Sequence, residues 1–254
     1  MGLSPVYDRI GSTYARYRRA DPRIAAQIDR ALAGATTVLD VGAGTGSYET
    51  SRRRYVAVEP SRLMLGQRRP DSPPAVQAVA GRLPFPDDAF DAAMAILTVH
   101  HWPDAPAGLA ELRRVTRGRI VILTWDAEHF ANTFWLVRDY LPESALQERP
   151  LCTLPAVRSL LGPCQVEPVV VPHDCTDGFF AAYWRRPEVY LDPDARAAIS
   201  GLALLEPAVV ERMVSALRED LSSGAWHRRH SDLLAQDNYD HGYRLVVTDD
   251  TQPP

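Results

Sequence analysis

Val38–Gly46 reads Val-Leu-Asp-Val-Gly-Ala-Gly-Thr-Gly, and this stretch decides the fold. The residues up to Val41 are rich in β-branched side chains, which indicates a short buried strand. Three glycines follow, at Gly42, Gly44 and Gly46. Because glycine has no Cβ and tolerates positive φ, such a backbone can turn sharply and lie directly against a ligand. We therefore expect a strand that ends in a ligand-binding loop.

A second strand with an acidic end completes the pattern of a nucleotide half-site. Tyr55–Glu59 reads Tyr-Val-Ala-Val-Glu, and an acid at that place accepts hydrogen bonds from ribose hydroxyls. The spacing of the glycines distinguishes between the cofactors that such a loop can bind. A dinucleotide site with the pattern Gly-x-Gly-x-x-Gly needs a third glycine at position 47, which is Ser47 here, so NAD is disfavoured. A Walker-type phosphate loop is disfavoured because the chain contains no lysine.

Two motifs resemble those of a known enzyme class. The pattern Gly-x-Gly-x-Gly, with Asp40 two residues before the first glycine, resembles motif I of the class I S-adenosylmethionine-dependent methyltransferases. Leu83-Pro84-Phe85-Pro86-Asp87 with Phe90-Asp91 resembles a signature of the branch typified by ubiquinone and menaquinone C-methyltransferases. The resemblance extends over about residues 7–125. It implies an α/β fold with a seven-stranded, mostly parallel, Rossmann-like sheet that is doubly wound and has an antiparallel last strand.

The resemblance also implies S-adenosyl-L-methionine as cofactor and S-adenosyl-L-homocysteine as product. Met64 would lie against the adenine ring, which suits a polarizable thioether, and a core position is the alternative. The branch usually reads Gly-Asp-Ala where this chain reads Val79-Ala80-Gly81, so adenine recognition is expected from backbone groups at 80–82. The expected cofactor contacts are Tyr14, Arg18, Asp40, Gly42, Ala43, Gly44, Gly46, Glu59, Pro60, Met64, Ala80, Gly81, Arg82, Leu97 and Thr98.

Residues 6–31 are expected to form helices in two pieces, the second of which starts at Asp21-Pro22. The first piece is similar to the N-terminal lid helix of the family, in which Tyr and Arg side chains lie over the methionine end of the cofactor. Arg18 would pair with the cofactor carboxylate through a charge-assisted fork, and Arg19 is an equally placed competitor. The alternative is a helix that packs its aromatic face on the core.

The catalytic candidate follows the strand expected at 90–97. Because the carboxyl ends of central strands form the ligand crevice in doubly wound folds, His100 is expected near the transferring methyl group. An unperturbed pKa of about 6.5 suits a general base, and a structural loop clamp is the alternative role. A metal ion would need further ligands at fixed spacing, so no metal site is predicted.

The remaining core elements follow in order. A helix is expected at 107–116, a strand at 118–125 that ends in Trp125, helices within 130–162 that are broken by prolines, and strands at 166–171 and 243–248. The breaking prolines are Pro142, Pro150 and Pro155. Residues 47–51 leave room for little more than one helical turn after the glycine loop, and the Arg52-Arg53-Arg54 triplet is expected to face solvent.

About 70 residues, 173–242, separate the last two strands, which is too long for a structureless loop. We expect helices near 178–184, 193–205 and 207–221 and interpret the segment as a helical cap over the acceptor site. A dimerisation or packing element is the alternative. The domains are then lid helices at 1–34, a core at 35–172 with 243–249, the cap, and a disordered tail at 250–254. The expected acceptor contacts are Tyr7, Tyr17, His101, Trp102, Trp125, Tyr183 and Trp184.

Composition limits the partners. The net charge of −4 disfavours nucleic acid as a partner, and the 28 basic residues are all arginine, so lysine is not available as a catalytic base. Cys152, Cys164 and Cys175 are odd in number and lack Cys-x-x-Cys spacing, which favours a reducing compartment without structural zinc. With no signal peptide pattern and no membrane-spanning apolar run, we expect a cytoplasmic protein. We also expect a monomer or homodimer, and no membrane partner.

The resemblance implies methyl transfer to an oxygen, nitrogen or carbon atom. The aromatic residues of the cap and the acidic net charge predict that the acceptor is a small organic molecule, in bacterial specialised metabolism. Two alternatives stay open. One is a methyltransferase that acts on tRNA or a peptide, which would favour a basic stripe or an open groove. The other is a cofactor-binding module without turnover, which the short segment after Gly46 and the missing adenine Asp keep open.

Overall fold

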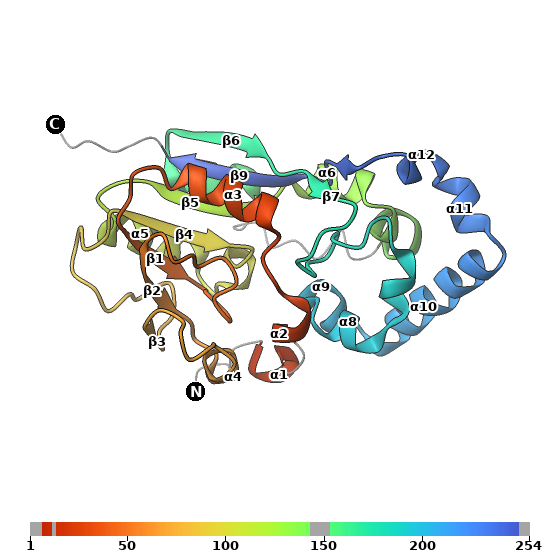
Figure 1. Ribbon diagram of the computed structural model, residues 1–254, viewed down its shortest axis with the longest axis horizontal. Helices are drawn as coiled ribbons and strands as arrows, with labels where there is room; N and C mark the ends of the chain where they lie inside the picture. Colours follow the sequence, from red (N-terminus) through yellow and green to blue (C-terminus); the bar gives the residue numbers. More distant parts are fainter. Residues whose placement is uncertain (1–6, 12–13, 143–152, 249–254) are drawn as a thin grey trace.

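The computed structural model describes residues 7–11, 14–142 and 153–248 (Figure 1). Within these residues the main sheet has seven strands in the order β3-β2-β1-β4-β5-β9-β6. β9 runs antiparallel to both neighbours and the other pairs are parallel, so the predicted Rossmann-like sheet is confirmed. The strands are β1 (Thr37–Val41), β2 (Arg54–Val58), β3 (Ala75–Val76), β4 (Ala92–Ile96), β5 (Ile120–Trp125), β6 (Cys164–Pro168) and β9 (Tyr243–Thr248).

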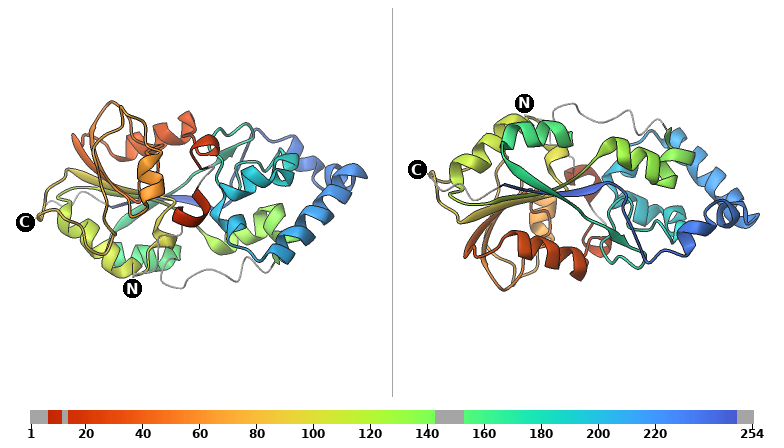
Figure 2. Two further views of the ribbon diagram at one scale, coloured as in Figure 1. Left: turned by 90° about the horizontal axis from the view of Figure 1, so that it is seen from below. Right: turned by 90° about the horizontal axis from the view of Figure 1, so that it is seen from above.

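The central strands are buried on both faces. In β1, Val38 packs into one hydrophobic cluster while its neighbour Leu39 packs into the other, as the alternation of side chains along a strand requires. The first cluster includes Ile28 of α3 (Pro22–Ala31), and the second includes Leu112 of α5 (Ala105–Val115). Figure 2 shows α3 and α5 on opposite faces of the sheet.

The predicted start of α3 is confirmed. Asp21 is its N-cap and accepts a hydrogen bond from the backbone N–H of Arg23, while Pro22 occupies the first turn. Arg53 was expected to face solvent with its triplet, but its guanidinium donates to the carbonyl oxygens of Ala33 and Ala35 beyond the end of α3. Only part of the triplet is therefore a solvated face, because the last carbonyl groups near a helix end need donors.

The other helices of the N-terminal half and core are short. Pro155 was expected to break a helix, but it lies in the first turn of α7, which Thr153 caps, because proline lacks only an N–H that is unpaired at that position. Pro150, Cys152 and the expected tail lie outside the described residues. The helices are α1 (Tyr7–Ile10), α2 (Tyr14–Tyr17), α4 (Arg62–Gly66), η2 (Val99–His101), α6 (Ala127–Thr133), η3 (Leu136–Tyr140) and α7 (Leu154–Leu161).

The segment after the sixth strand carries helices of its own. Its ends pair in a two-stranded antiparallel sheet of β7 (Val171–Pro172) and β8 (Asn238–Tyr239). Figure 1 shows its helices as a group beyond the main sheet, with α1 and α2 beside α8 and α9. The elements are η6 (Pro187–Leu191), α8 (Pro193–Ala197), α9 (Ser200–Ala203), α10 (Pro207–Ser222), α11 (Ala225–Arg229) and α12 (Ser231–Leu234).

Of the three helices expected in this segment, one is confirmed, one is divided into two and one is wrong. The long helix near 207–221 is confirmed as α10, and the stretch 193–205 is divided into α8 and α9. The helix expected near 178–184 is wrong, because this stretch consists of turns. Phe179, Ala181, Ala182, Tyr183 and Trp184 are all buried there, and a helix at a core surface buries only one stripe of its side chains.

Asp91, from the second sequence signature, ties β4 to β1. Its carboxylate accepts from the backbone N–H groups of Thr36 and Thr37 at 3.0 and 2.8 Å, and it pairs with Arg117 at 2.5 Å. The hydrogen bonds from Arg117, followed by those from Thr37, hold the pKa of Asp91 well below its usual range. This signature residue therefore stabilises the sheet.

We predict that Asp91→Asn lowers the free energy of unfolding at pH 7 by about 1–2 kcal/mol, because a charged acceptor is removed. The folded pKa is lower than the unfolded one, so this stabilisation is complete above the unfolded value of about 3.9 and is lost as the pH falls through the folded value. Urea denaturation at pH 7 and at lower pH should show the difference between variant and wild type shrinking. A difference that does not change with pH would contradict the prediction. Asp71→Asn, in an exposed ion pair with Arg69, is the control and should change little.

Candidate active site

The glycine loop joins the tips of β1 and β2. Gly42, Gly44 and Gly46 all have positive φ, at 76°, 55° and 82°. A Cβ on Gly42 would lie 2.0 Å from Oγ1 of Thr98, at the end of β4, so only glycine allows this approach of two strand ends. A Cβ on Gly44 would instead make only ordinary contacts, at 3.7 Å from the ring of Tyr14.

Glu59 lies at the tip of β2 and is bound to the loop. Its carboxylate accepts from the backbone N–H of Gly44 at 2.9 Å and from that of Ser61 at 2.8 Å. Burial raises the pKa of Glu59, and these two hydrogen bonds oppose the rise. Carboxylate oxygens beside a glycine loop are the acceptors that ribose hydroxyls need. Pro60, the next residue, accepts a hydrogen bond from Gln77 through its carbonyl.

A buried ion pair supports the far end of the loop. Glu49 and Arg68 approach to 2.7 Å, and their side chains are 2% and 5% exposed. A Cβ on Gly46 would lie 2.7 Å from Oε2 of Glu49 and 2.9 Å from Nη1 of Arg68. Asp40 is buried in β1 nearby, and burial, followed by the charge of Glu49, raises its pKa. Sequence reasoning missed Glu49 and Arg68, since neither belongs to a recognisable motif.

The N-terminal segment reaches the same loop. The rings of Tyr7 and Tyr14 meet edge to face at 5.2 Å, and the guanidinium of Arg18 lies 5.0 Å from the Tyr14 ring centre. Ser47 donates from its hydroxyl to the backbone carbonyl of Arg18. The structure therefore brings Tyr14 and Arg18 to the glycine loop, whereas the Arg19 side chain is exposed.

Arg18 has a protein partner that the sequence did not reveal. Its Nε and Nη2 lie 2.5 and 3.3 Å from the carboxylate oxygens of Asp177, which also accepts from the Tyr48 hydroxyl at 2.7 Å. The side chain of Asp177 is 0% exposed. Sequence reasoning assigned Arg18 to a cofactor carboxylate alone, because Asp177 lies in a distant segment without a motif.

Four expected residues form an aromatic cluster at the ends of β4 and β5. The His100 ring lies 4.6 Å from that of Trp125 and 3.8 Å from that of His101. The hydroxyl of Tyr7 lies 3.0 Å from Nε2 of His101. Burial lowers the pKa of His100 well below its ordinary value, and the neighbouring His101 and Arg18 add to the effect. His100 is therefore a neutral imidazole at neutral pH.

Leu97 joins β4 to this cluster in a strained conformation. Its φ is +51°, a region that leucine rarely adopts, although its N–H is paired with the carbonyl of Leu123. Backbone strain of this kind concentrates at functional sites, where the surrounding structure enforces it. Thr98 follows it and is buried against Gly42.

The structure does not bring Trp102 and Trp184 to the cluster. Trp102 packs on Gly108 in the core, and Trp184 is 0% exposed and donates from its indole to the carbonyls of Val171 and Pro172. Both indoles were expected to contact the acceptor, but their large apolar surface is buried in the core. Tyr17 donates to Asp192 on the exposed surface.

The remaining expected residues lie around the site. Burial raises the pKa of Tyr183 to about 12, and its ring lies 5.0 Å below the guanidinium of Arg186. Met64 is buried, and its methyl group would lie 2.8 Å from a Cβ on Gly11. Ala80, Gly81 and Arg82 form a turn closed by a hydrogen bond from the Arg82 N–H to the Val79 carbonyl. Ala43 donates its N–H to the carbonyl of Val58.

Known proteins share this architecture. A family model described as a methyltransferase domain matches residues 39–122. A solved structure of a putative methyltransferase from an antibiotic biosynthesis pathway of Anabaena variabilis ATCC 29413 is 33% identical, with a TM-score of 0.81 over 91% of this chain and 98% of that chain. This chain belongs to the class I S-adenosylmethionine-dependent methyltransferases.

Two further proteins are similar to parts of the methyltransferase or to its fold. Demethylmenaquinone methyltransferase of Mycobacterium sp. strain KMS is 36% identical over 110 residues, which are 41% of this chain and 48% of that protein. The methyltransferase thus spans about half the length of the curated relatives it matches. Geranyl diphosphate C-methyltransferase of Streptomyces coelicolor A3(2), solved with S-adenosyl-L-homocysteine, has a TM-score of 0.50 over 89% of this chain and 76% of that chain. At 16% identity this likeness concerns the fold alone.

The residues at the loop fit S-adenosylmethionine. Gly44 leaves room at the loop surface that a Cβ would fill, Glu59 supplies carboxylate oxygens, and Arg18 supplies a cation. In the part of the chain that the structure describes, no helix has both the length and the apolar character needed to span a membrane. No group of three or more His, Cys, Asp or Glu side chains in that part is arranged to hold a metal ion.

Substitutions of Gly42 and Gly44 are predicted to affect stability and ligand binding to different degrees. Gly44→Ala should cost about 1–2 kcal/mol of stability because of its positive φ, and should weaken S-adenosylhomocysteine binding at least about tenfold, because the methyl group lies on the loop surface. Gly42→Ala should lower the melting temperature more, since its methyl group meets Thr98 inside the protein. Thermal denaturation and isothermal titration of both variants test this. Equal stability loss in both variants would contradict it.

Proposed function

We propose that the methyltransferase transfers the methyl group of S-adenosylmethionine to an oxygen, nitrogen or carbon atom of a small organic molecule in bacterial specialised metabolism. The aromatic cluster of Tyr7, His100, His101 and Trp125 beside the glycine loop carries this proposal. Aromatic faces bind flat or apolar molecules, and the tyrosine and histidine polar groups can orient them. The antibiotic biosynthesis pathway assigned to the Anabaena relative supports a role in specialised metabolism.

We assign the acceptor-binding role to the cluster together with the insertion at 173–242. A hydrogen bond to Ser200 of α9 is among the contributions to the pKa of Tyr7, which burial raises. Tyr7 therefore lies between His101 of the core and the insertion. We further propose that the protein acts in the cytoplasm as a monomer or homodimer.

Methyl transfer depends mainly on the alignment of the acceptor atom with the methyl group. S-adenosylmethionine supplies an electrophilic methyl group when bound. The protein has to hold the acceptor atom in line with that group, and good alignment provides up to about 7–11 kcal/mol of the barrier. Glu59 and the glycine loop would hold the cofactor, the cluster would orient the acceptor, and the aromatic side chains would exclude water. His100 would take a proton from acceptors that must lose one.

Cofactor binding tests the proposal first. In isothermal titrations we expect wild type to bind S-adenosylmethionine and S-adenosylhomocysteine, with no binding of NAD. Glu59→Ala should weaken both adenosyl compounds at least about tenfold, because charge-assisted hydrogen bonds to the ribose are lost. The control is Glu167→Ala, an exposed glutamate on β6. NAD binding, or no binding of either adenosyl compound, would overturn the proposal.

The lowered pKa of His100 gives a pH prediction. An ordinary histidine base loses activity around pH 6.5 as it becomes protonated, but His100 stays neutral below that value, so kcat should remain constant down to about pH 6. His100→Gln should lower kcat about 100-fold or more for acceptors that lose a proton. Rate profiles from pH 5 to 9 on an acceptor panel measure both. A wild-type midpoint near pH 6.5 would contradict the lowered pKa of His100, and a variant with unchanged kcat would show that His100 is not the base.

A further inference from the structure

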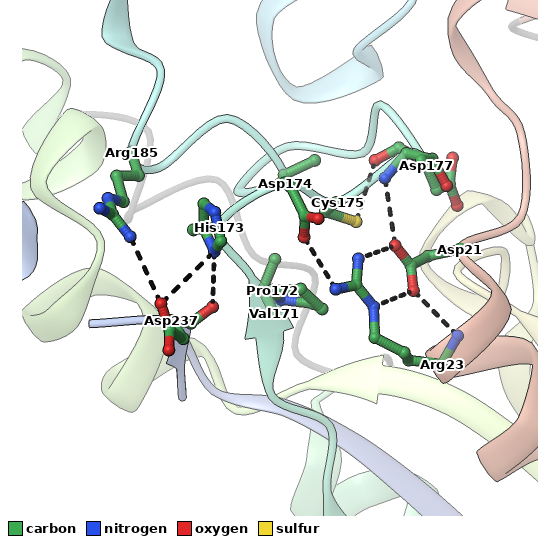
Figure 3. Close-up of polar contacts among 12 residues, drawn as sticks. Asp21, Arg23, Val171, Pro172, His173, Asp174, Cys175, Asp177, Arg185 and Asp237 are labelled. Atoms are coloured by element: carbon green, nitrogen blue, oxygen red, sulfur yellow. Dashed lines mark hydrogen bonds and ion pairs between the residues drawn. The ribbon is translucent and has the colours of Figure 1, made fainter. Parts of the chain in front are cut away.

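The first residues of the insertion lie along the N-terminal chain from Tyr17, at the end of α2, to Arg23, in the first turn of α3. Asp174, Thr176 and Gly178 each contact that segment through a hydrogen bond or ion pair. The contacts are Asp174 to Arg23 at 2.8 Å, the Thr176 N–H to Asp21 at 3.2 Å and the Gly178 N–H to the Tyr17 carbonyl at 2.9 Å. Figure 3 shows the ion pair of Asp174 with Arg23, together with Asp21 and Asp177 of the same region. The insertion and the N-terminal segment are therefore joined along several consecutive residues.

Asp177 is the buried centre of this junction. Its carboxylate receives the Nε–Nη2 edge of Arg18 and the hydroxyl of Tyr48. One side chain of the insertion thus holds one residue of the N-terminal segment and one residue that follows the glycine loop. The Arg18 side chain is 9% exposed, so a missing partner would leave a nearly buried charge without compensation.

The junction fixes the plane of the Arg18 guanidinium. Asp177 binds one edge, and the Tyr14 ring lies 5.0 Å from the guanidinium carbon. Tyr14 in turn lies against Gly44, and Ser47 binds the Arg18 carbonyl, so the guanidinium is held next to the glycine loop. Arginine has five N–H donors, and the contacts with Asp177 use two of its three nitrogens. The donors that remain can bind a second carboxylate.

We propose that Asp177 is a positioning residue for the cofactor, which holds Arg18 so that its remaining N–H groups receive the α-carboxylate of S-adenosylmethionine at the glycine loop. This inference rests on the proposed function. It makes the insertion part of the cofactor site through Asp177, whose carboxylate binds Arg18 and Tyr48. An arginine that is held in place loses less entropy when it binds a carboxylate, so removing Asp177 should weaken that one interaction.

Two ligands separate positioning from a general structural role. S-adenosylhomocysteine carries the α-carboxylate, and 5′-methylthioadenosine shares its adenosine and thioether but lacks the amino-acid part. For Asp177→Asn we expect S-adenosylhomocysteine to bind at least about tenfold more weakly than to wild type, as for the loss of one charge-assisted interaction. Binding of 5′-methylthioadenosine should change by less than about twofold. Isothermal titration of the full chain measures both.

Asp174→Asn is the matched control. Asp174 lies in the same segment and forms an ion pair with Arg23, but both side chains are about half exposed, at 59% and 48%. The titrations of this variant should match wild type for both ligands.

Tyr48→Phe provides a milder variant if Asp177→Asn fails to fold, which circular dichroism would reveal. It removes one hydrogen bond to Asp177 and keeps the buried ring, so S-adenosylhomocysteine should bind several-fold more weakly while 5′-methylthioadenosine is unaffected. Equal weakening of both ligands, unchanged binding of S-adenosylhomocysteine, or tighter binding of it would overturn the inference and leave the proposed function standing. Failure of wild type to bind any adenosyl compound would instead overturn the proposed function itself.

Discussion

The approach of Gly42 to Thr98 is the constraint on which this site depends. The tips of β1 and β4 come so close that the Thr98 hydroxyl occupies the place of a Cβ on Gly42. β1 and β4 are neighbours in the middle of the sheet, where the direction of chain progression reverses, and ligands of open α/β sheets bind at that point. The contact therefore sets the glycine loop and the strained Leu97, and through them the cluster around His100.

The loop also compensates for an unusually short connection. No helix lies between Gly42 and β2 in the structure, so the help that a helix N-terminus gives to a bound ligand is reduced. A buried ion pair of Glu49 and Arg68 fills the space beneath Gly46 instead. Buried pairs add little net stability over apolar packing but fix geometry, since losing either partner is costly.

The charged groups next to the glycine loop are also bound by partners within the protein. Glu59 is bound by backbone N–H groups, and Arg18 is bound by a carboxylate from the insertion. The aromatic cluster, in contrast, contains the neutral imidazole of His100, because burial lowers the pKa of this side chain. One end of the site is thus suited to the polar cofactor and the other to a less polar acceptor, which matches the division of labour in the proposed function.

The sequence by itself determined the sheet, the glycine loop, Glu59 and the start of α3, because these depend on local patterns of apolar residues, glycine and capping groups. It also selected Tyr7, His100, His101 and Trp125, which the strand ends bring together. Only the tertiary structure decided that Trp102 and Trp184 are core residues, that residues 178–184 form turns, and that Asp177 binds Arg18. The reason is that an indole, a buried aromatic run and an arginine each have several possible partners. Contacts between residues far apart in the chain decide which partner is used, and Arg18 and Asp177 are 159 residues apart. Such contacts leave no periodic signal in the sequence.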